Sequence, residues 1–169
     1  GNVEFFTNDS NVFVSGDFGE YFGDDSLLIM KEKPHLRYFD EKDSSTIDLD
    51  AKILRYDRRL GYGIAIDNVF AVFIGEDSLD SPMTIRCDSL VYDIKDDFIY
   101  AFGNLFLSKD DQNVEADSAY FDRNGELIKL FGNPKLYDNK SLLAGDLMRI
   151  ELESSNIKRL YVHDNAKGT

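Results

Sequence analysis

The sequence predicts an all-β fold, an elongated antiparallel sandwich or open roll of stacked, repeated strand pairs. Three observations favour it: an aromatic composition suited to strands, an internal repeat with a fixed spacing, and apolar residues that alternate with polar ones. The chain has 169 residues, of which 43% are hydrophobic, with 13 Phe, 9 Tyr and no Trp. Aromatic side chains fit the pleated, half-buried surface of a sheet. The length suits one domain rather than two.

A short motif recurs along the chain. It consists of an apolar residue, a small residue two positions later, and an aromatic residue or Ile five positions after the small one, as in IRCDSLVYD and VEADSAYFD. Self-similarity of this kind indicates a repeat architecture. We therefore predict a single domain, residues 1–169, of about five repeats. Their small positions are Gly16, Ala51, Cys87, Ala116 and Gly145.

A second half-motif, centred on Asn, follows the small residue at a distance of 17 positions. Four pairs share this spacing: Gly16 with Lys33, Ala51 with Asn68, Cys87 with Asn104, and Ala116 with Asn133. The chain also opens on such a half-motif, Gly1-Asn2-Val3, with no first half before it. We therefore expect the chain to be a segment of a longer protein.

Alternation within the first half-motif predicts a half-buried strand. Ile85 and Cys87 alternate with Arg86 and Asp88, and a period of two places one row of side chains on each face of a strand. Further along, the apolar set changes parity, as at Leu90. Such a change predicts a bulge or bend that turns the other row inward. Each repeat is thus expected to contain two strands joined by a short turn.

The charge and the single cysteine exclude several classes of function. Lys and Arg total 19 against 32 Asp and Glu, for a net charge of −13, which repels a phosphate backbone. We expect no nucleic-acid partner. Cys87 is the only cysteine, so an intramolecular disulfide is excluded, and its small equivalents in the other repeats indicate a buried structural residue. No apolar run approaches 18 residues, so we expect neither a membrane span nor a signal peptide.

No candidate catalytic or metal site emerges from the motifs. His35 and His163 lie in different repeats, with no nucleophile or carboxylate at the spacing of a triad or a metal site. Acidic pairs such as Asp96-Asp97 lack the spacing of an EF-hand and are interpreted as polar turns. The segment 122–125 contains Asn-Gly and is likewise interpreted as a turn. We expect no enzyme activity, no cofactor and no bound metal.

Residues 83–166 resemble the OstA-like repeats of the LptA-type lipopolysaccharide-transport bridge proteins, and residues 12–82 follow in the same register. The resemblance rests on the recurring string small-Asp-x-apolar-x-aromatic, as in VEADSAYFD, followed by strings such as FGNLFL and FGNPKLY. Lys52 departs from the motif, where Asp is expected, and Lys33 departs where Asn is expected. The resemblance implies a twisted, V-shaped β-jellyroll, or β-taco, of antiparallel strands in the periplasm, with a hydrophobic groove that holds acyl chains.

The resemblance also implies partners. Family members stack end to end between the inner and outer membranes, so we expect other bridge proteins or copies of this chain to pair with it by strand addition. It leaves open whether the chain is a bridge protein, the membrane-anchored component, or the periplasmic domain that precedes an outer-membrane barrel.

The expected ligand is the acyl part of lipopolysaccharide or a related glycolipid. The alternative is a structural or assembly module with a filled interior that pairs end to end with other periplasmic or outer-membrane proteins without carrying lipid. In that case the small residues only let two sheets pack closely, instead of leaving a groove for acyl chains. For the lipid-binding function, the residues expected to line the groove are Leu49, Ala51, Ile53, Ile85, Cys87, Leu105, Val114, Ala116, Leu130, Leu136, Leu143 and Leu147.

Overall fold

The computed structural model describes residues 3–6, 11–41, 44–75, 81–153 and 156–169. These residues form 17 strands that belong to one antiparallel sheet, and none of them is helical. The predicted all-β class is confirmed. Residues 1 and 2 of the opening half-motif lie outside the described residues. Within the described ranges, no helix is long and apolar enough to cross a membrane.

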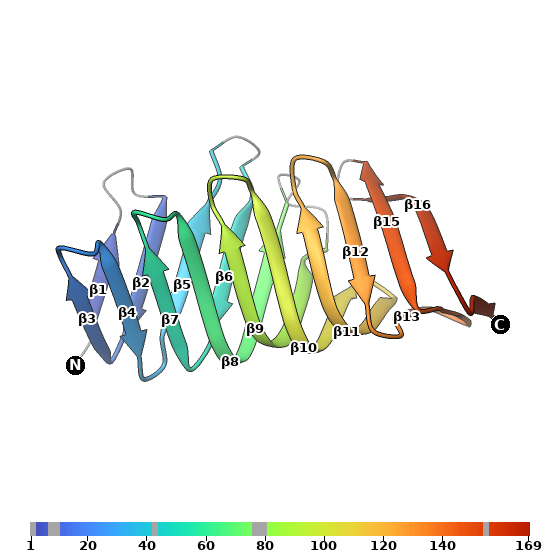
Figure 1. The fold of residues 1–169 in the computed structure, drawn as a ribbon, viewed down its shortest axis with the longest axis horizontal. Helices are drawn as coiled ribbons and strands as arrows, with labels where there is room; N and C mark the ends of the chain where they lie inside the picture. The colour runs from blue at the N-terminus through green and yellow to red at the C-terminus, as the bar shows by residue number, and fades with distance from the viewer. Residues whose placement is uncertain (1–2, 7–10, 42–43, 76–80, 154–155) are drawn as a thin grey trace.

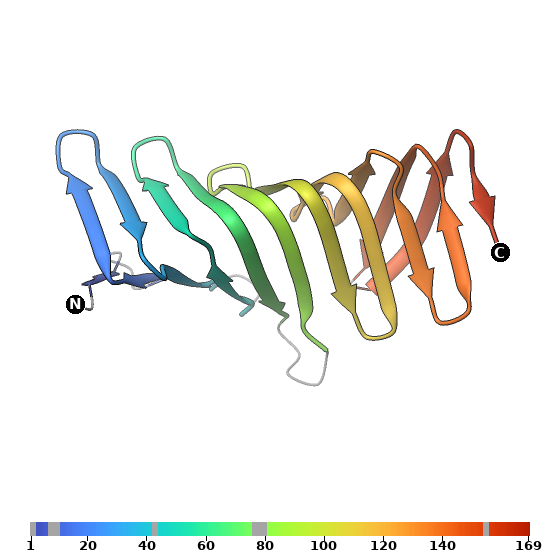
Figure 2. The same cartoon turned by 90° about the horizontal axis from the view of Figure 1, so that it is seen from below.

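The sheet is folded lengthwise into two layers, which meet along a crease (Figure 1). On the opposite side each layer ends in a row of turns, which we call its rim. Asp97 and Arg123 lie in the rim of one layer, and Asp40 and Ser45 lie in the rim of the other. Figures 1 and 2 show the strands running across the long axis, with the two chain ends at opposite ends of the molecule. Four long strands pass through both layers: β8 (Tyr62–Ile74), β9 (Met83–Asp93), β10 (Phe98–Lys109) and β11 (Gln112–Asp122).

The other strands belong to one layer each. The front layer of Figure 1 contains β3 (Phe18–Phe22), β4 (Leu27–Lys31), β7 (Ile53–Asp57), β12 (Leu127–Phe131), β15 (Leu147–Glu153) and β16 (Asn156–His163). The rear layer contains β1 (Val3–Phe6), β2 (Val12–Gly16), β5 (His35–Phe39), β6 (Thr46–Asp50), β13 (Lys135–Asp138), β14 (Ser141–Ala144) and β17 (Lys167–Gly168).

The crease is made by pairs of consecutive residues in the left-handed backbone region. Asn, Asp and Gly tolerate this region better than other residues. Where such a pair falls inside a long strand, the register shifts, between Ile66 and Val69 in β8 and between Phe102 and Leu105 in β10. In the described part of the chain the pairs are Glu32-Lys33, Asp67-Asn68, Gly103-Asn104, Gly132-Asn133 and Asp164-Asn165. The predicted bend is therefore present. The residues inserted at the register shifts lie at the Asn positions of β8 and β10, and not in the strands that carry the small residues.

Polar side chains connect neighbouring strands at the crease. The Asn104 amide donates to Asp88 Oδ2 at 2.9 Å, and Asn165 makes the same contact with Asp146 at 2.9 Å. Lys52 departs from the motif, yet its Nζ lies 2.6 Å from Asp67 Oδ2, so an ion pair replaces the amide contact there. The motif and its departure thus serve the same bend. The number of five repeats stays a prediction.

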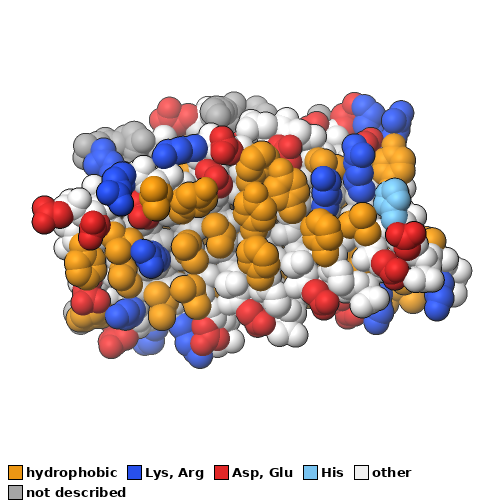
Figure 3. All heavy atoms as spheres, viewed as in Figure 1, with side chains coloured by type: hydrophobic (Ala, Val, Ile, Leu, Met, Phe, Trp, Pro, Cys, Tyr) orange, Lys and Arg blue, Asp and Glu red, His pale blue; other side chains and the backbone are white. Residues whose placement is uncertain are grey.

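Alternation places one row of each strand inside the fold. In β15, Met148 is fully buried, whereas its neighbour Leu147 faces the other way and is only half-buried. The outer face is also apolar in places: hydrophobic side chains gather across the front layer (Figure 3), and Ile66 and Phe102 are exposed there. Hydrophobicity alone therefore does not distinguish the inner row from the outer one.

Replacing Gly132 by Ala tests the crease. Gly132 has a φ of 78°, and an added Cβ collides with the Asp117 carboxylate. We expect Gly132→Ala to lower the free energy of unfolding by about 1–3 kcal/mol, measured by urea denaturation. Gly63→Ala is the matched control, because a Cβ there meets no atom within 4 Å. Equal stability of the two variants would contradict a strained crease.

Two adjacent residues of β15 test which row is inside. Met148→Ala empties a fully buried site and is expected to cost about 2–5 kcal/mol of unfolding free energy. Leu147→Ala removes a side chain outside the core cluster and is expected to cost less than about 1 kcal/mol. Thermal and urea denaturation measure both. If Leu147→Ala loses more unfolding free energy than Met148→Ala, then the row of side chains that contains Leu147 faces the interior, which contradicts the structure.

Candidate functional site

An apolar trough lies between the two layers. It is densely packed beside the crease, where Leu105, Leu130 and Met148 are fully buried. Farther from the crease it opens into two cavities of about 820 and about 830 Å³, volumes that include their open mouths.

The two cavities follow each other along the trough. The first lies toward the N-terminal end and is lined from both layers, for example by Leu28, Tyr56 and Ile99 in front and by Val12, Tyr38 and Ile47 behind. The second lies toward the C-terminal end and is lined by residues that include Met83, Val114, Phe121, Ile128, Leu136 and Ile150. Phe73 of β8 borders both cavities.

The structure brings most of the sequence-predicted groove residues into the trough. Leu49 lines the first cavity, and Val114 and Leu136 line the second. Seven others belong to the core cluster or pack against it without lining a cavity: Ala51, Ile85, Cys87, Leu105, Ala116, Leu130 and Leu143. The last two, Ile53 and Leu147, are outside the cluster, because the neighbouring residues Leu54 and Met148 occupy the inward row.

The small positions do not create the open space. A Cβ on Gly145 collides with Val162, and one on Gly16 comes within 3.2 Å of the Lys31 carbonyl. Neither glycine lines a cavity, and the same holds for Ala51, Cys87 and Ala116. The small residues are therefore needed for the close approach of strands at the crease, and the open space lies farther toward the rims.

The groove residues expected from the sequence do not include an aromatic row near the rims. Tyr38 and Phe73 of the rear layer and Tyr56, Tyr92 and Phe121 of the front layer line the cavities. The signal was present in the sequence, because Tyr56, Tyr92 and Phe121 are the aromatic positions that end three of the first half-motifs. Tyr38 and Tyr92 contact each other across the trough, with ring centroids 5.7 Å apart in an edge-on arrangement.

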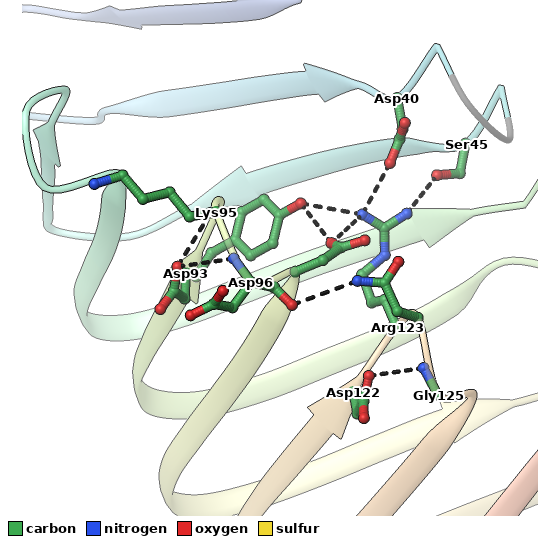
Figure 4. A network of polar contacts seen from close by, with 11 residues as sticks. Asp40, Ser45, Asp93, Lys95, Asp96, Asp122, Arg123 and Gly125 are labelled. Carbon is green, nitrogen blue, oxygen red and sulfur yellow. Dashed lines mark hydrogen bonds and ion pairs between the residues drawn. The ribbon is translucent and has the colours of Figure 1, made fainter.

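A buried ionic network crosses the mouth of the trough beside these tyrosines (Figure 4). Arg123, in the turn after β11, places Nη1 3.1 Å from Asp40 Oδ2 and 3.0 Å from Asp97 Oδ1. Its Nη2 donates to Ser45 Oγ at 3.1 Å. The Arg123 side chain is 5% exposed. The sequence predicts only a turn at residues 122–125, because the partners of Arg123 lie far away along the chain.

Tyr92 completes this network. Its hydroxyl donates to Asp97 Oδ1 at 2.9 Å and accepts from Arg123 Nη1 at 3.1 Å. Burial raises the pKa of Tyr92, and burial together with the nearby Asp40 carboxylate raises the pKa of Tyr38. Both phenols therefore stay protonated at neutral pH. In the described ranges no buried side-chain oxygen or nitrogen lacks a hydrogen-bond partner.

Cys87 lies buried at the crease, outside both cavities. Burial raises the pKa of its thiol to about 11. Only the thiolate is nucleophilic, so the protonated thiol packs as a small apolar group. This agrees with its interpretation as a structural residue.

Comparison with known proteins identifies the fold. No family model matches the sequence, and no curated protein matches it. The structure is similar to the crystal structure of LptH from Pseudomonas aeruginosa, described as the LptA homologous periplasmic component of the conserved lipopolysaccharide transport device. The TM-score is 0.57 and the sequence identity 7%, over 94% of this chain and 93% of LptH. The predicted resemblance to the LptA-type jellyroll is therefore confirmed at the level of the fold.

Proposed function

We propose that this chain is a periplasmic module that holds the acyl chains of lipopolysaccharide or a related glycolipid on their way between the inner and outer membranes. The observation that carries the proposal is the pair of adjoining apolar cavities inside the trough. The fold likeness to a periplasmic lipopolysaccharide-transport component supports the choice of ligand and compartment.

The trough suits an amphipathic molecule. Its open rims allow a polar headgroup to stay in water while the apolar tails enter the cavities. About ten buried methylenes contribute roughly 8 kcal/mol, and the entropy lost on association offsets much of this. The resulting affinity is moderate and reversible, as passage from one protein to the next requires.

Free strand edges at both ends support end-to-end assembly. Among the described residues, β1 and β3 each pair with one neighbour at the N-terminal end, and β16 and β17 do so at the C-terminal end. Unpaired edges accept further strands. We propose that other bridge proteins or further copies of this chain extend the trough there.

The proposed role involves no catalytic step. The cavity walls are mainly hydrocarbon and aromatic, and the Cys87 thiol lies at the crease in its protonated form. An amphipathic lipid therefore finds a mainly apolar surface to slide on.

Photocrosslinking from β8 tests lipid occupancy. Phe73→p-azidophenylalanine places a probe of nearly the same shape where both cavities meet. With purified lipopolysaccharide and ultraviolet light, we expect a lipid-linked band on gels. Phe70→p-azidophenylalanine is the matched control, because Phe70 lies on the same strand in the outward row and is expected to give little labelling.

The comparison of the two positions decides between the two functions. Strong labelling from Phe73 and weak labelling from Phe70 supports a lipid trough. Equal labelling from Phe73 and Phe70 means that both probes only touch lipid aggregates from outside, which counts against a lipid trough. No labelling from Phe73, in a variant that keeps its fold by circular dichroism, favours the structural or assembly module.

A further inference from the structure

Arg123 occupies the junction of the two cavities. Its guanidinium carbon lies 5.5 Å from the centroid of the Phe73 ring, and Phe73 is the aromatic residue that borders both cavities. The side chain therefore sits above the point where an acyl chain would pass from one cavity to the other.

The contacts of Arg123 join the two free rims. Arg123 and Asp97 belong to turns of the front layer, whereas Asp40 and Ser45 lie between β5 and β6 of the rear layer. Arg123 and Ser45 are 78 positions apart in the sequence. At the crease the layers share backbone hydrogen bonds, but at this place the rims are connected through side chains.

Stability alone does not account for such a network. Replacing a buried ion pair by well-packed apolar residues is often neutral or stabilising, whereas removal of one partner is costly. The surrounding trough is apolar, so an apolar contact between the rims would close it equally well. An ionic contact differs from an apolar one because water can hydrogen-bond to the separated charged groups. The contact between the two rims can therefore break and form again.

We propose that Arg123 is a clasp that closes the mouth of the trough at the junction of the two cavities. An acyl chain enters, leaves or crosses this junction when Arg123 releases Asp40 and Ser45 and the rims separate. This gate rests on the proposed function, since it regulates the entry of lipid into the same trough.

The gate predicts a kinetic signature. Arg123→Gln removes the clasp, so binding and release of dansyl-undecanoic acid, followed by stopped-flow fluorescence, should both accelerate by about tenfold or more, the equivalent of roughly 1.4 kcal/mol of barrier. The equilibrium Kd should stay nearly constant, because a gate alters the barrier and not the bound state. Arg37→Gln is the matched control, since Arg37 binds Asp48 on the outer face of the rear layer.

A second variant guards against misfolding. Arg123→Gln leaves Asp40 without the Arg123 charge, which destabilises a buried carboxylate. The double variant Asp40→Asn with Arg123→Gln removes both charges of the contact between the rims, while Asp97 keeps its hydrogen bond from the Tyr92 hydroxyl. It should show the same acceleration. Spin labels at Glu41 and Asn124, exposed residues on opposite rims, should report a narrow distance distribution in the wild type and the Arg37 variant, and a broad one in both clasp variants.

The outcomes separate the gate from the proposed function. If the wild type shows no saturable uptake of the fatty acid, both the lipid function and the gate are overturned. If the wild type takes up the fatty acid but the clasp variants keep wild-type rates or a narrow rim distance, the gate alone fails. In a third outcome, the clasp variants release the fatty acid faster and bind it with lower affinity, while its rate of entry is unchanged. Arg123 would then anchor the headgroup, and the clasp is rejected.

Discussion

The left-handed residue pairs at the crease are the constraint on which the rest of the structure depends. Two of the pairs bend a long strand, β8 or β10, and the other three connect a front-layer strand to a rear-layer strand, so a single sheet becomes two facing layers. Amide and ion-pair contacts such as Asn104 with Asp88 and Lys52 with Asp67 accompany the bend. Because side chains alternate along each strand, the bend also decides which row faces the interior.

The interior changes character from the crease to the rims. Beside the crease the layers are so close that Gly145 has no room for a Cβ, and Leu105 and Met148 are fully buried. Toward the rims the layers diverge, and aromatic side chains such as Phe73 border open space. The result is a wedge-shaped trough whose wide part lies toward the rims.

The sequence motif predicted the fold class, the bend and most of the inward residues, because each depends on local spacing. It placed Ile53 and Leu147 on the wrong side, since the parity changes at the crease and the outer face of the front layer is also apolar. The motif left open whether the small residues leave a groove or only let two sheets pack closely, because the open space depends on how two distant strands diverge. Arg123 was interpreted as part of a turn, because its partner Ser45 is 78 positions away, and no local pattern reports such a contact.

Methyl NMR with a spin-labelled fatty acid tests most directly whether the folded sheet encloses a trough that admits acyl chains. The protein has three methionines, of which Met30 lines the first cavity and Met83 the second. Stearic acid with a nitroxide near its methyl end should broaden the methyl signals of Met30 and Met83 more than that of Ile29, which lies in the outward row of β4. Broadening of Ile29 with sharp Met30 and Met83 signals would contradict the account.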